Sequence, residues 1–148
     1  MTNLGTASAG DVKTIYKTFR LNKDVFPHIR SDYIRRACEE GRCIYHSGVV
    51  IIWQQYQKSV RLGSVTIPRD SIMLHQIVNS TDQRGTAADV FRRFADALKR
   101  PIYLSVRGSN VRARRFYEKV GMKPIGSITW SNGSIPGVIY SLSEESAS

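Results

Sequence analysis

The sequence predicts an α/β fold in which a mixed sheet carries helices on both of its faces. Residues 71–80 (SIMLHQIVNS) are dominated by apolar side chains, which is typical of a strand buried on both faces. A helical pattern over 83–100 and a second strand over 102–108 follow, and a strand–helix–strand unit implies a right-handed crossover between parallel strands. The flanking segments have the pattern of hairpins. They therefore add antiparallel strands to the same sheet.

Two helices are expected before the sheet. Asp11 is a candidate N-cap for the first helix, whose pattern is interrupted by Asn22 and Pro27. Ser31 is a candidate cap for the second, which ends at Gly41. The apolar residues that share a face at helical spacing are Val12, Ile15, Tyr16 and Phe19 in the first helix, and Tyr33, Ile34, Ala37 and Cys38 in the second.

The other strands are predicted from hairpin and turn signals. Residues 43–57 have the pattern of two strands around a Ser47-Gly48 turn. Residues 62–68 form a short strand or a loop, because Pro68 excludes a long central strand. The last predicted elements are a helix over 109–121 and two closing strands over 122–130 and 136–142.

Length and composition fit one domain over residues 1–148, with a frayed tail over 143–148. No apolar run is long enough to cross a membrane, and the N-terminal stretch lacks the features of a secretory signal. Cys38 and Cys43 lie in one local segment and resemble neither a disulfide framework nor a metal site. A cytoplasmic location and no metal are therefore expected.

The charge balance points to an anionic partner. Lys and Arg number 22 and Asp and Glu number 12, which gives a net charge of +10. Nucleic acid and a polyphosphate cofactor both fit such a surplus. The alternative is a charge spread over the whole surface that serves solubility.

Residues 77–91 (IVNSTDQRGTAADVF) place a small-residue turn between a buried strand and a helix. The free N–H groups and the positive dipole end of a helix start can bind an anion. Small side chains over 85–88 let a phosphate approach the backbone, while Arg84 adds charge and Thr86 a hydroxyl. The alternative is an ordinary strand-to-helix turn with small residues for packing.

Residues 104–122 (LSVRGSNVRARRFYEKVGM) form a second strand-to-helix segment. Tyr117 follows Asn110 by two helical turns, so both side chains can face one cleft. A tyrosine there can donate a proton to a leaving thiolate. Alternatively, Asn110 is only a helix cap and Tyr117 only packs in the core.

Together the two segments resemble the GNAT superfamily of acyl-CoA-dependent N-acyltransferases. The family's phosphate-binding motif, Gln/Arg-x-x-Gly-x-Gly/Ala, is matched by Gln83 and Ala88, with Thr86 in place of its first glycine. The short basic chain also resembles acyltransferases carried by bacteriophages. The family's later motif is matched more specifically, by Asn110, Ala113, Phe116, Tyr117, Glu118, Lys119, Gly121 and Met122.

The resemblance implies a mostly antiparallel sheet with a splayed parallel strand pair that binds acetyl-CoA. The backbone of Val78 and Asn79 would then bond the acyl carbonyl and the pantetheine arm. Asn110 would contact the pantetheine, and Tyr117 would be the general acid toward the CoA sulfur. The backbone that would hold the pyrophosphate is that of Gln83, Arg84, Gly85, Thr86, Ala87 and Ala88.

An acceptor amine is protonated at neutral pH, so a group must take its proton. The strand before the phosphate turn lacks the glutamate that this family often places there. His75 is the closest titratable candidate on that strand. Gln76 points to the opposite face, so only one of the two can line the cleft. Asp70 and a water chain are the alternatives.

The resemblance implies an acetyltransferase that moves an acetyl group from acetyl-CoA to a primary amine by direct attack on the thioester. One alternative acceptor is nucleic acid, either a modified base or an aminoacyl-tRNA, which the +10 charge favours. Another alternative is an inactive acyl-CoA-binding module. Many members of the family form homodimers. The basic residues expected near the acceptor are Arg30, Arg35, Arg36, Lys58 and Arg61.

Overall fold

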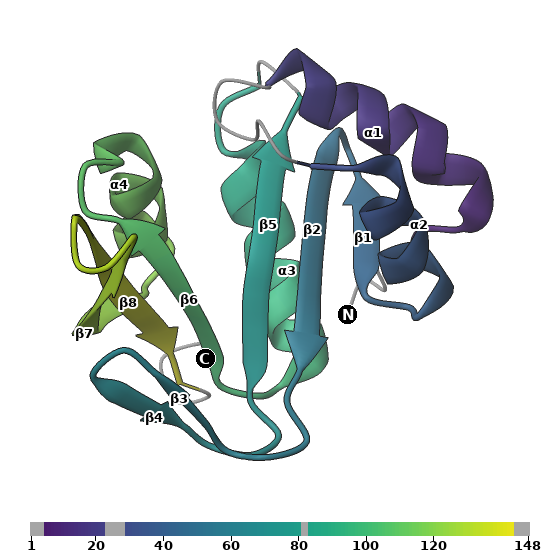
Figure 1. Ribbon diagram of the computed structural model, residues 1–148. Coiled ribbons are helices and arrows are strands. Elements are labelled where there is room, and N and C mark those ends of the chain that lie inside the picture. The colour runs from purple at the N-terminus through teal and green to yellow at the C-terminus, as the bar shows by residue number, and fades with distance from the viewer. Residues whose placement is uncertain (1–4, 23–28, 81–82, 144–148) are drawn as a thin grey trace. The chain divides into compact units, whose positions relative to one another are not determined.

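The computed structural model describes residues 5–22, 29–80 and 83–143. The helices are the short 3-10 turn η1 (Ala9–Asp11), α1 (Val12–Leu21), α2 (Ser31–Glu39), α3 (Thr86–Leu98) and α4 (Val111–Lys119) (Figure 1). The strands are β1 (Cys43–His46), β2 (Val49–Gln55), β3 (Val60–Leu62), β4 (Val65–Ile67), β5 (Ile72–Asn79), β6 (Ile102–Arg107), β7 (Lys123–Trp130) and β8 (Ile135–Leu142).

The main sheet is mixed, as the sequence predicted. Its six strands follow the order β1-β2-β5-β6-β8-β7. β5 and β6 run parallel, whereas β1–β2, β6–β8 and β7–β8 are antiparallel. The helix α3 connects the two parallel strands, which confirms the predicted crossover unit.

The chain divides into two compact units. The first comprises Met1–Gln54 and His75–Arg93, and the second comprises Gln55–Leu74 and Phe94–Ser148. The boundary passes through both β5 and α3.

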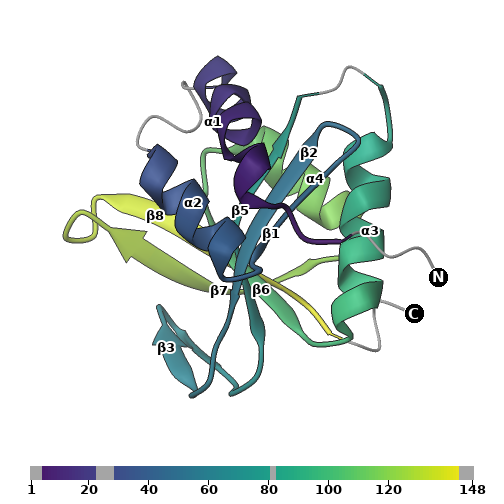
Figure 2. The same cartoon turned by 90° about the vertical axis from the view of Figure 1, so that its right-hand side faces the viewer.

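The core of the first unit lies between two helices and the strands. The buried apolar residues of α1 and α2 pack with Val50, Ile52 and Val78 in one apolar cluster. The intervening residues of β2, among them Val49 and Ile51, are also fully buried, so both faces of this strand are covered. Figure 2 shows α3 on the side of β2 opposite α1 and α2.

The hairpin of the first unit turns at the residues that the sequence indicated. Ser47 and Gly48 have φ values of 52° and 80°. Positive φ at both central residues is the signature of the type I′ turn, whose twist matches that of the flanking strands. The register pairs His46 with Val49 and fixes which residues of β2 face α1 and α2.

The second unit contains β6, β8 and β7 and a separate small hairpin. The sequence predicted at most one short strand over 62–68, whereas β3 and β4 form two strands that turn at Gly63 and Ser64. β3 and β4 pair with each other. Ser64 also connects this hairpin to β7. Its amide donates to the carbonyl of Ser127 at 2.9 Å, and its hydroxyl accepts from the amide of Ser127 at 2.9 Å.

The predicted helix starts require two corrections. Asp11 stands at the N-cap position of α1, but its carboxylate accepts from the amide of Ser8 at 2.9 Å and does not cap α1. Ser31 is the first residue of α2 rather than its cap, which is Arg30. The predicted interruption at Pro27 lies outside the described residues, as does most of the predicted tail.

Candidate functional site

The turn between β5 and α3 is anchored to the β1–β2 hairpin. Ser80 donates to the carbonyl of Gly48 twice, through its amide at 2.8 Å and its hydroxyl at 2.7 Å. Both donors follow the last residue of β5, so they fix the point at which the chain leaves the strand. Residues 81–82 of the predicted anion-binding segment lie outside the described residues.

The residues that lead into α3 are exposed to solvent. Gln83, Arg84 and Gly85 are exposed, and Gly85 has a φ of 82° with nothing within 4 Å of the position of a Cβ. The amide of Asp89 donates to the carbonyl of Gly85 at 3.0 Å, which opens the helical ladder. The amides of residues 86–88 precede that bond, and such first-turn amides have no intrahelical acceptor.

The six residues of this segment divide by burial. Ala88 is only 3% exposed and packs into the core, whereas Thr86 and Ala87 are half-buried. A small side chain at residue 88 is therefore required by packing, independent of any ligand. The exposed part, Gln83–Gly85, is where an anion can approach.

The parallel ladder between β5 and β6 is short. It pairs Ile72 with Ile102 and Met73 with Tyr103, while β5 continues to Asn79. The predicted backbone contacts of Val78 and Asn79 therefore fall on a part of β5 beyond this ladder. Val78 is buried and its side chain belongs to the apolar cluster of the first unit, whereas Asn79 is exposed.

His75 is exposed to solvent at the residue level. Its pKa is nevertheless lowered, first by desolvation from the surrounding protein and then by the charge of Arg42. Both effects favour the neutral imidazole, which is the form that accepts a proton. Gln76, next along β5, is half-buried, and its side chain bonds the hydroxyl of Tyr33 on α2.

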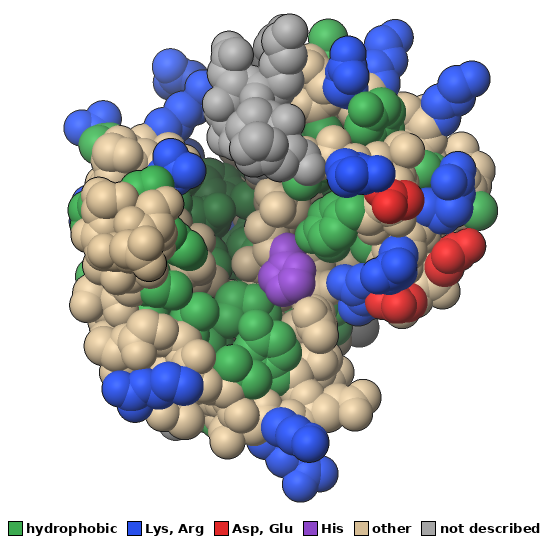
Figure 3. Space-filling model, in the orientation of Figure 1, with side chains coloured by type: hydrophobic (Ala, Val, Ile, Leu, Met, Phe, Trp, Pro, Cys, Tyr) green, Lys and Arg blue, Asp and Glu red, His purple; other side chains and the backbone are tan. Residues whose placement is uncertain are grey.

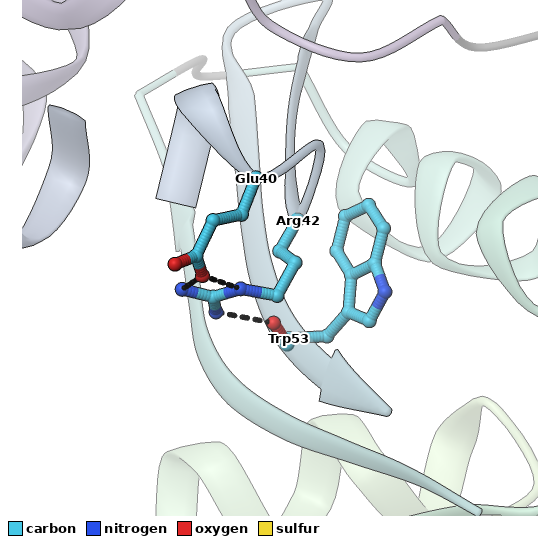
Figure 4. Close-up of polar contacts among 3 residues, drawn as sticks. All are labelled: Glu40, Arg42 and Trp53. Carbon is cyan, nitrogen blue, oxygen red and sulfur yellow. Dashed lines mark hydrogen bonds and ion pairs between the residues drawn. The ribbon is translucent and has the colours of Figure 1, made fainter. Parts of the chain in front are cut away.

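Arg42, just before β1, is held by two hydrogen bonds and an ion pair (Figure 4). Its Nε and Nη2 each lie 2.7 Å from Oε1 of Glu40, and its Nη1 donates to the carbonyl of Trp53 at 2.8 Å. This geometry fixes a positive charge in the first unit, where it acts on both His75 and Tyr33. No local sequence pattern marks Arg42, because its partners are a neighbouring side chain and the backbone of another strand.

Asp70 is not placed near the end of β5 that carries Asn79. It precedes the other end of that strand, where its amide donates to the carbonyl of Tyr56 at 2.8 Å. Its carboxylate pairs with Arg69 at 3.6 Å. Its φ of 69° fits a tight turn, so Asp70 serves the turn geometry.

Asn110 is the N-cap of α4. Its side-chain oxygen accepts from the amide of Ala113 at 3.2 Å, and its backbone carbonyl accepts from the amide of Arg114 at 3.1 Å. The capping alternative for Asn110 is thereby confirmed. A contact with pantetheine remains a prediction.

Tyr117 lies on α4 in the second unit and is half-buried. Burial raises the pKa of its phenol to about 12, so the hydroxyl is protonated at neutral pH. Its ring meets that of Phe116 edge-on, with centroids 5.7 Å apart, and that of Tyr140 at 6.1 Å. The residue thus combines a packing role with a retained proton.

The described residues contain neither a candidate metal-binding group nor a candidate membrane-spanning helix. Within the described ranges 5–22, 29–80 and 83–143, His, Cys, Asp and Glu side chains form no group of three that could hold a metal ion. Across the same part of the chain, no helix has the length and apolar character needed to span a membrane.

Solved structures that are similar to this chain include several acetyltransferases. A GNAT-family acetyltransferase from Bacillus cereus ATCC 10987 is 18% identical with a TM-score of 0.69, covering 97% of each chain. One from Streptococcus agalactiae 2603 is 11% identical with a TM-score of 0.76, covering 93% of this chain and 92% of that one. The Arabidopsis thaliana protein NAA60 in complex with acetyl-CoA is 14% identical with a TM-score of 0.65, covering 93% and 96%.

The likeness is structural. No protein-family model matches the sequence, and no curated protein matches it significantly. At these identities the comparison shows the fold, which is that of the GNAT acetyltransferases.

Proposed function

We propose that this chain, which has the GNAT fold, is an N-acetyltransferase that moves an acetyl group from acetyl-CoA to a primary amine. The observation that carries the proposal is the start of α3, where an exposed segment with Gly85 at positive φ precedes the first helical hydrogen bond. The NAA60 structure contains acetyl-CoA, which supports the same donor here.

The start of α3 suits the diphosphate of CoA. Arg84 brings a positive charge, and the amides of Gly85, Thr86 and Ala87 bring donors at the positive end of the helix dipole. Thr86 adds a hydroxyl donor where the family has a glycine. Because Gly85 has open space around it, a phosphate oxygen can approach its backbone closely.

The transfer proceeds by direct attack. The neutral amine adds to the thioester carbonyl carbon, and the tetrahedral intermediate then collapses with cleavage of the C–S bond. Tyr117 donates a hydrogen bond, and finally its proton, to the departing sulfur. A phenol with a pKa of about 12 is a weak acid toward a thiolate in water. Desolvation also raises the pKa of the CoA thiol. The pKa values of the phenol and the thiol therefore become more similar as water is excluded, which makes proton transfer from Tyr117 less unfavourable.

His75 is the proposed acceptor of the amine proton. Its lowered pKa keeps the imidazole neutral at pH 7, so it is ready to act as a base without first losing a proton. The alternatives are Asp70, which precedes the first residue of β5, and proton loss to a chain of waters.

The donor is tested by thermal unfolding. Acetyl-CoA at a hundredfold excess over its Kd is expected to stabilise the folded chain by about 2.7 kcal/mol, and Tm should rise accordingly. S-acetylpantetheine, which lacks the diphosphate, is the matched control and should raise Tm much less. No rise with acetyl-CoA would remove the proposal.

A second candidate is an acyltransferase whose acceptor is nucleic acid. Lys13, Lys17 and Arg20 are exposed on α1, which has no acidic residue within its bounds. On the face drawn in Figure 3, basic side chains lie over α1 and α2 with acidic ones beside them. Of the basic residues expected near the acceptor, Arg30 is paired with Asp32 at 3.3 Å.

Binding to tRNA at two salt concentrations separates the two candidates. A nucleic-acid acceptor requires an affinity that falls steeply with salt, because binding releases counterions. Lys13→Gln with Lys17→Gln should flatten that slope. If tRNA does not bind even at low salt, the acceptor is a small molecule or a protein amine, and mass spectrometry of cell extract incubated with labelled acetyl-CoA can identify it.

A further inference from the structure

The phenol of Tyr140 joins two side chains of α4 inside the second unit. Tyr140 lies on β8 and is fully buried, at 0% exposure. Its hydroxyl donates to Oε2 of Glu118 at 2.6 Å and accepts from Nε of Arg114 at 3.1 Å. The shorter distance is typical of a charge-assisted O–H···O⁻ bond, which is stronger than a neutral one.

The same network reaches the turn before α4. Nη1 of Arg114 donates to the carbonyl of Gly108 at 3.0 Å. Arg114 and Glu118 are four residues apart and therefore lie on one face of the helix. One helix face is thus tied to a buried strand and to the turn that follows β6.

The protonation states support this arrangement. Burial raises the pKa of Tyr140, and of its two partners Arg114 lowers that pKa while Glu118 raises it. The hydroxyl therefore remains a donor at neutral pH. It also accepts from Arg114, so both hydrogen-bonding capacities of this buried group are used.

Tyr117 lies directly against this network. It precedes Glu118 in the chain, and its ring centroid is 6.1 Å from that of Tyr140 at an interplanar angle of 49°. On α4 its other aromatic neighbour is Phe116, at 5.7 Å and 72°. Any rotation of α4 about its own axis would move the Tyr117 hydroxyl, and the network opposes that rotation.

We propose that Tyr140, Glu118 and Arg114 are positioning residues that hold α4, and with it the Tyr117 phenol, in the orientation needed for proton donation. This inference rests on the proposed function. A general acid works only within hydrogen-bond reach of its target, and a shift of about 1 Å can cost about a hundredfold in rate. Tyr140 itself is buried and acts through Tyr117.

The first test needs no substrate. In protein labelled with ¹³C-tyrosine, the Tyr117 ring signal is assigned by its loss in Tyr117→Phe. Tyr140→Phe keeps the ring of residue 140 but removes its hydroxyl, and it is expected to shift or broaden the Tyr117 signal. Tyr103→Phe on β6 is the matched control and should leave that signal unchanged. An unmoved Tyr117 signal in Tyr140→Phe would overturn the proposal.

The second test is a double-mutant cycle on acetyl-CoA, with water as the nucleophile and the released thiol as the readout. Tyr140→Phe is expected to lower turnover about tenfold, with the KM for acetyl-CoA changed less than about twofold. If residue 140 acts through Tyr117, the double variant Tyr117→Phe/Tyr140→Phe should turn over no more slowly than Tyr117→Phe alone. If the double variant instead loses turnover by the product of the two single losses, the proposal is contradicted.

The conservative change at Glu118 completes the test. Glu118→Gln retains an oxygen that accepts from Tyr140, so it should recover most of the turnover that Glu118→Ala loses. Equal losses in both variants would count against the network. If acetyl-CoA raises no Tm and releases no thiol, the proposed function itself fails, whereas the tyrosine signals still decide whether the network orders Tyr117.

Discussion

Gly85 and Gly41 share a positive φ and open space at the position of a Cβ, although only Gly85 precedes α3. Their φ values are 82° and 70°, and an added Cβ would meet nothing within 4 Å at either position. An alanine at either site therefore introduces conformational strain of about 1–3 kcal/mol without a steric clash.

This pair separates ligand binding from stability. Gly85→Ala is expected to lower Tm and also to weaken acetyl-CoA binding by about tenfold, because a Cβ would stand where the diphosphate approaches. Gly41→Ala should lower Tm by a similar amount and leave the affinity unchanged. Calorimetric titration with acetyl-CoA measures the affinity of each variant, and thermal unfolding measures its Tm. Equal affinities in the two variants would place the diphosphate away from the start of α3.

Tyr117→Phe removes the proposed proton donor and keeps the ring. Turnover is expected to fall about a hundredfold or more, the usual range for loss of a general acid. The Tm should change little, because the packing against Phe116 and Tyr140 involves ring faces and edges. Acetyl-CoA consumption with a panel of amines provides the measurement. Turnover equal to that of wild type would exclude the role.

His75 gives a pH dependence with a defined sign. Its pKa lies below the ordinary value of 6.5, so the base is neutral at pH 7 and the rate should fall only at more acidic pH. The free energy of unfolding should likewise fall toward acidic pH. As the pH falls below about 6.5, the unfolded chain binds a proton that folded His75 does not yet bind, so stability is lost down to the folded pKa.

Arg42→Met tests the second cause of that shift. Removing the guanidinium should raise the pKa of His75, seen as a displaced histidine titration by NMR, with His75→Gln for assignment. The acidic limb of the rate should move toward higher pH in parallel. Arg36→Met, at an exposed position of α2, is the control. A His75 titration that stays in place in Arg42→Met would contradict the charge argument.

The sequence predicted the parts of the fold that local patterns determine. The two strands within residues 43–57, the Ser47-Gly48 turn and the Asn110 cap depend on residues close together in the chain, and all three are present. The separate β3–β4 hairpin was not predicted, because it is tied through Ser64 to Ser127, a contact between residues far apart in sequence. Its strands of three residues carry too little periodic signal.

The candidate site was predictable only as a set of motifs. The segment 83–88 and Tyr117 were identified from local spacing and resemblance. The Tyr140–Glu118–Arg114 network could not be identified, because β8 shows only a buried strand pattern in sequence and its tyrosine looks like a core aromatic. Likewise, Ala88 matched the phosphate motif, although its burial shows that packing also requires a small residue there.

Trp130 and Gly137 provide a test of the closing hairpin. Residue 137 faces Ile128 across the register, and an added Cβ there would overlap the six-membered ring of Trp130. Gly137→Ala is therefore expected to displace the indole, to shift its fluorescence emission to the red and to lower Tm. The nearby Gly133 has open space around it and a φ of 90°, so Gly133→Ala should strain only the turn and leave the emission unchanged. If Gly137→Ala keeps the wild-type emission, the indole does not cover this glycine, and the hairpin must be packed by other side chains.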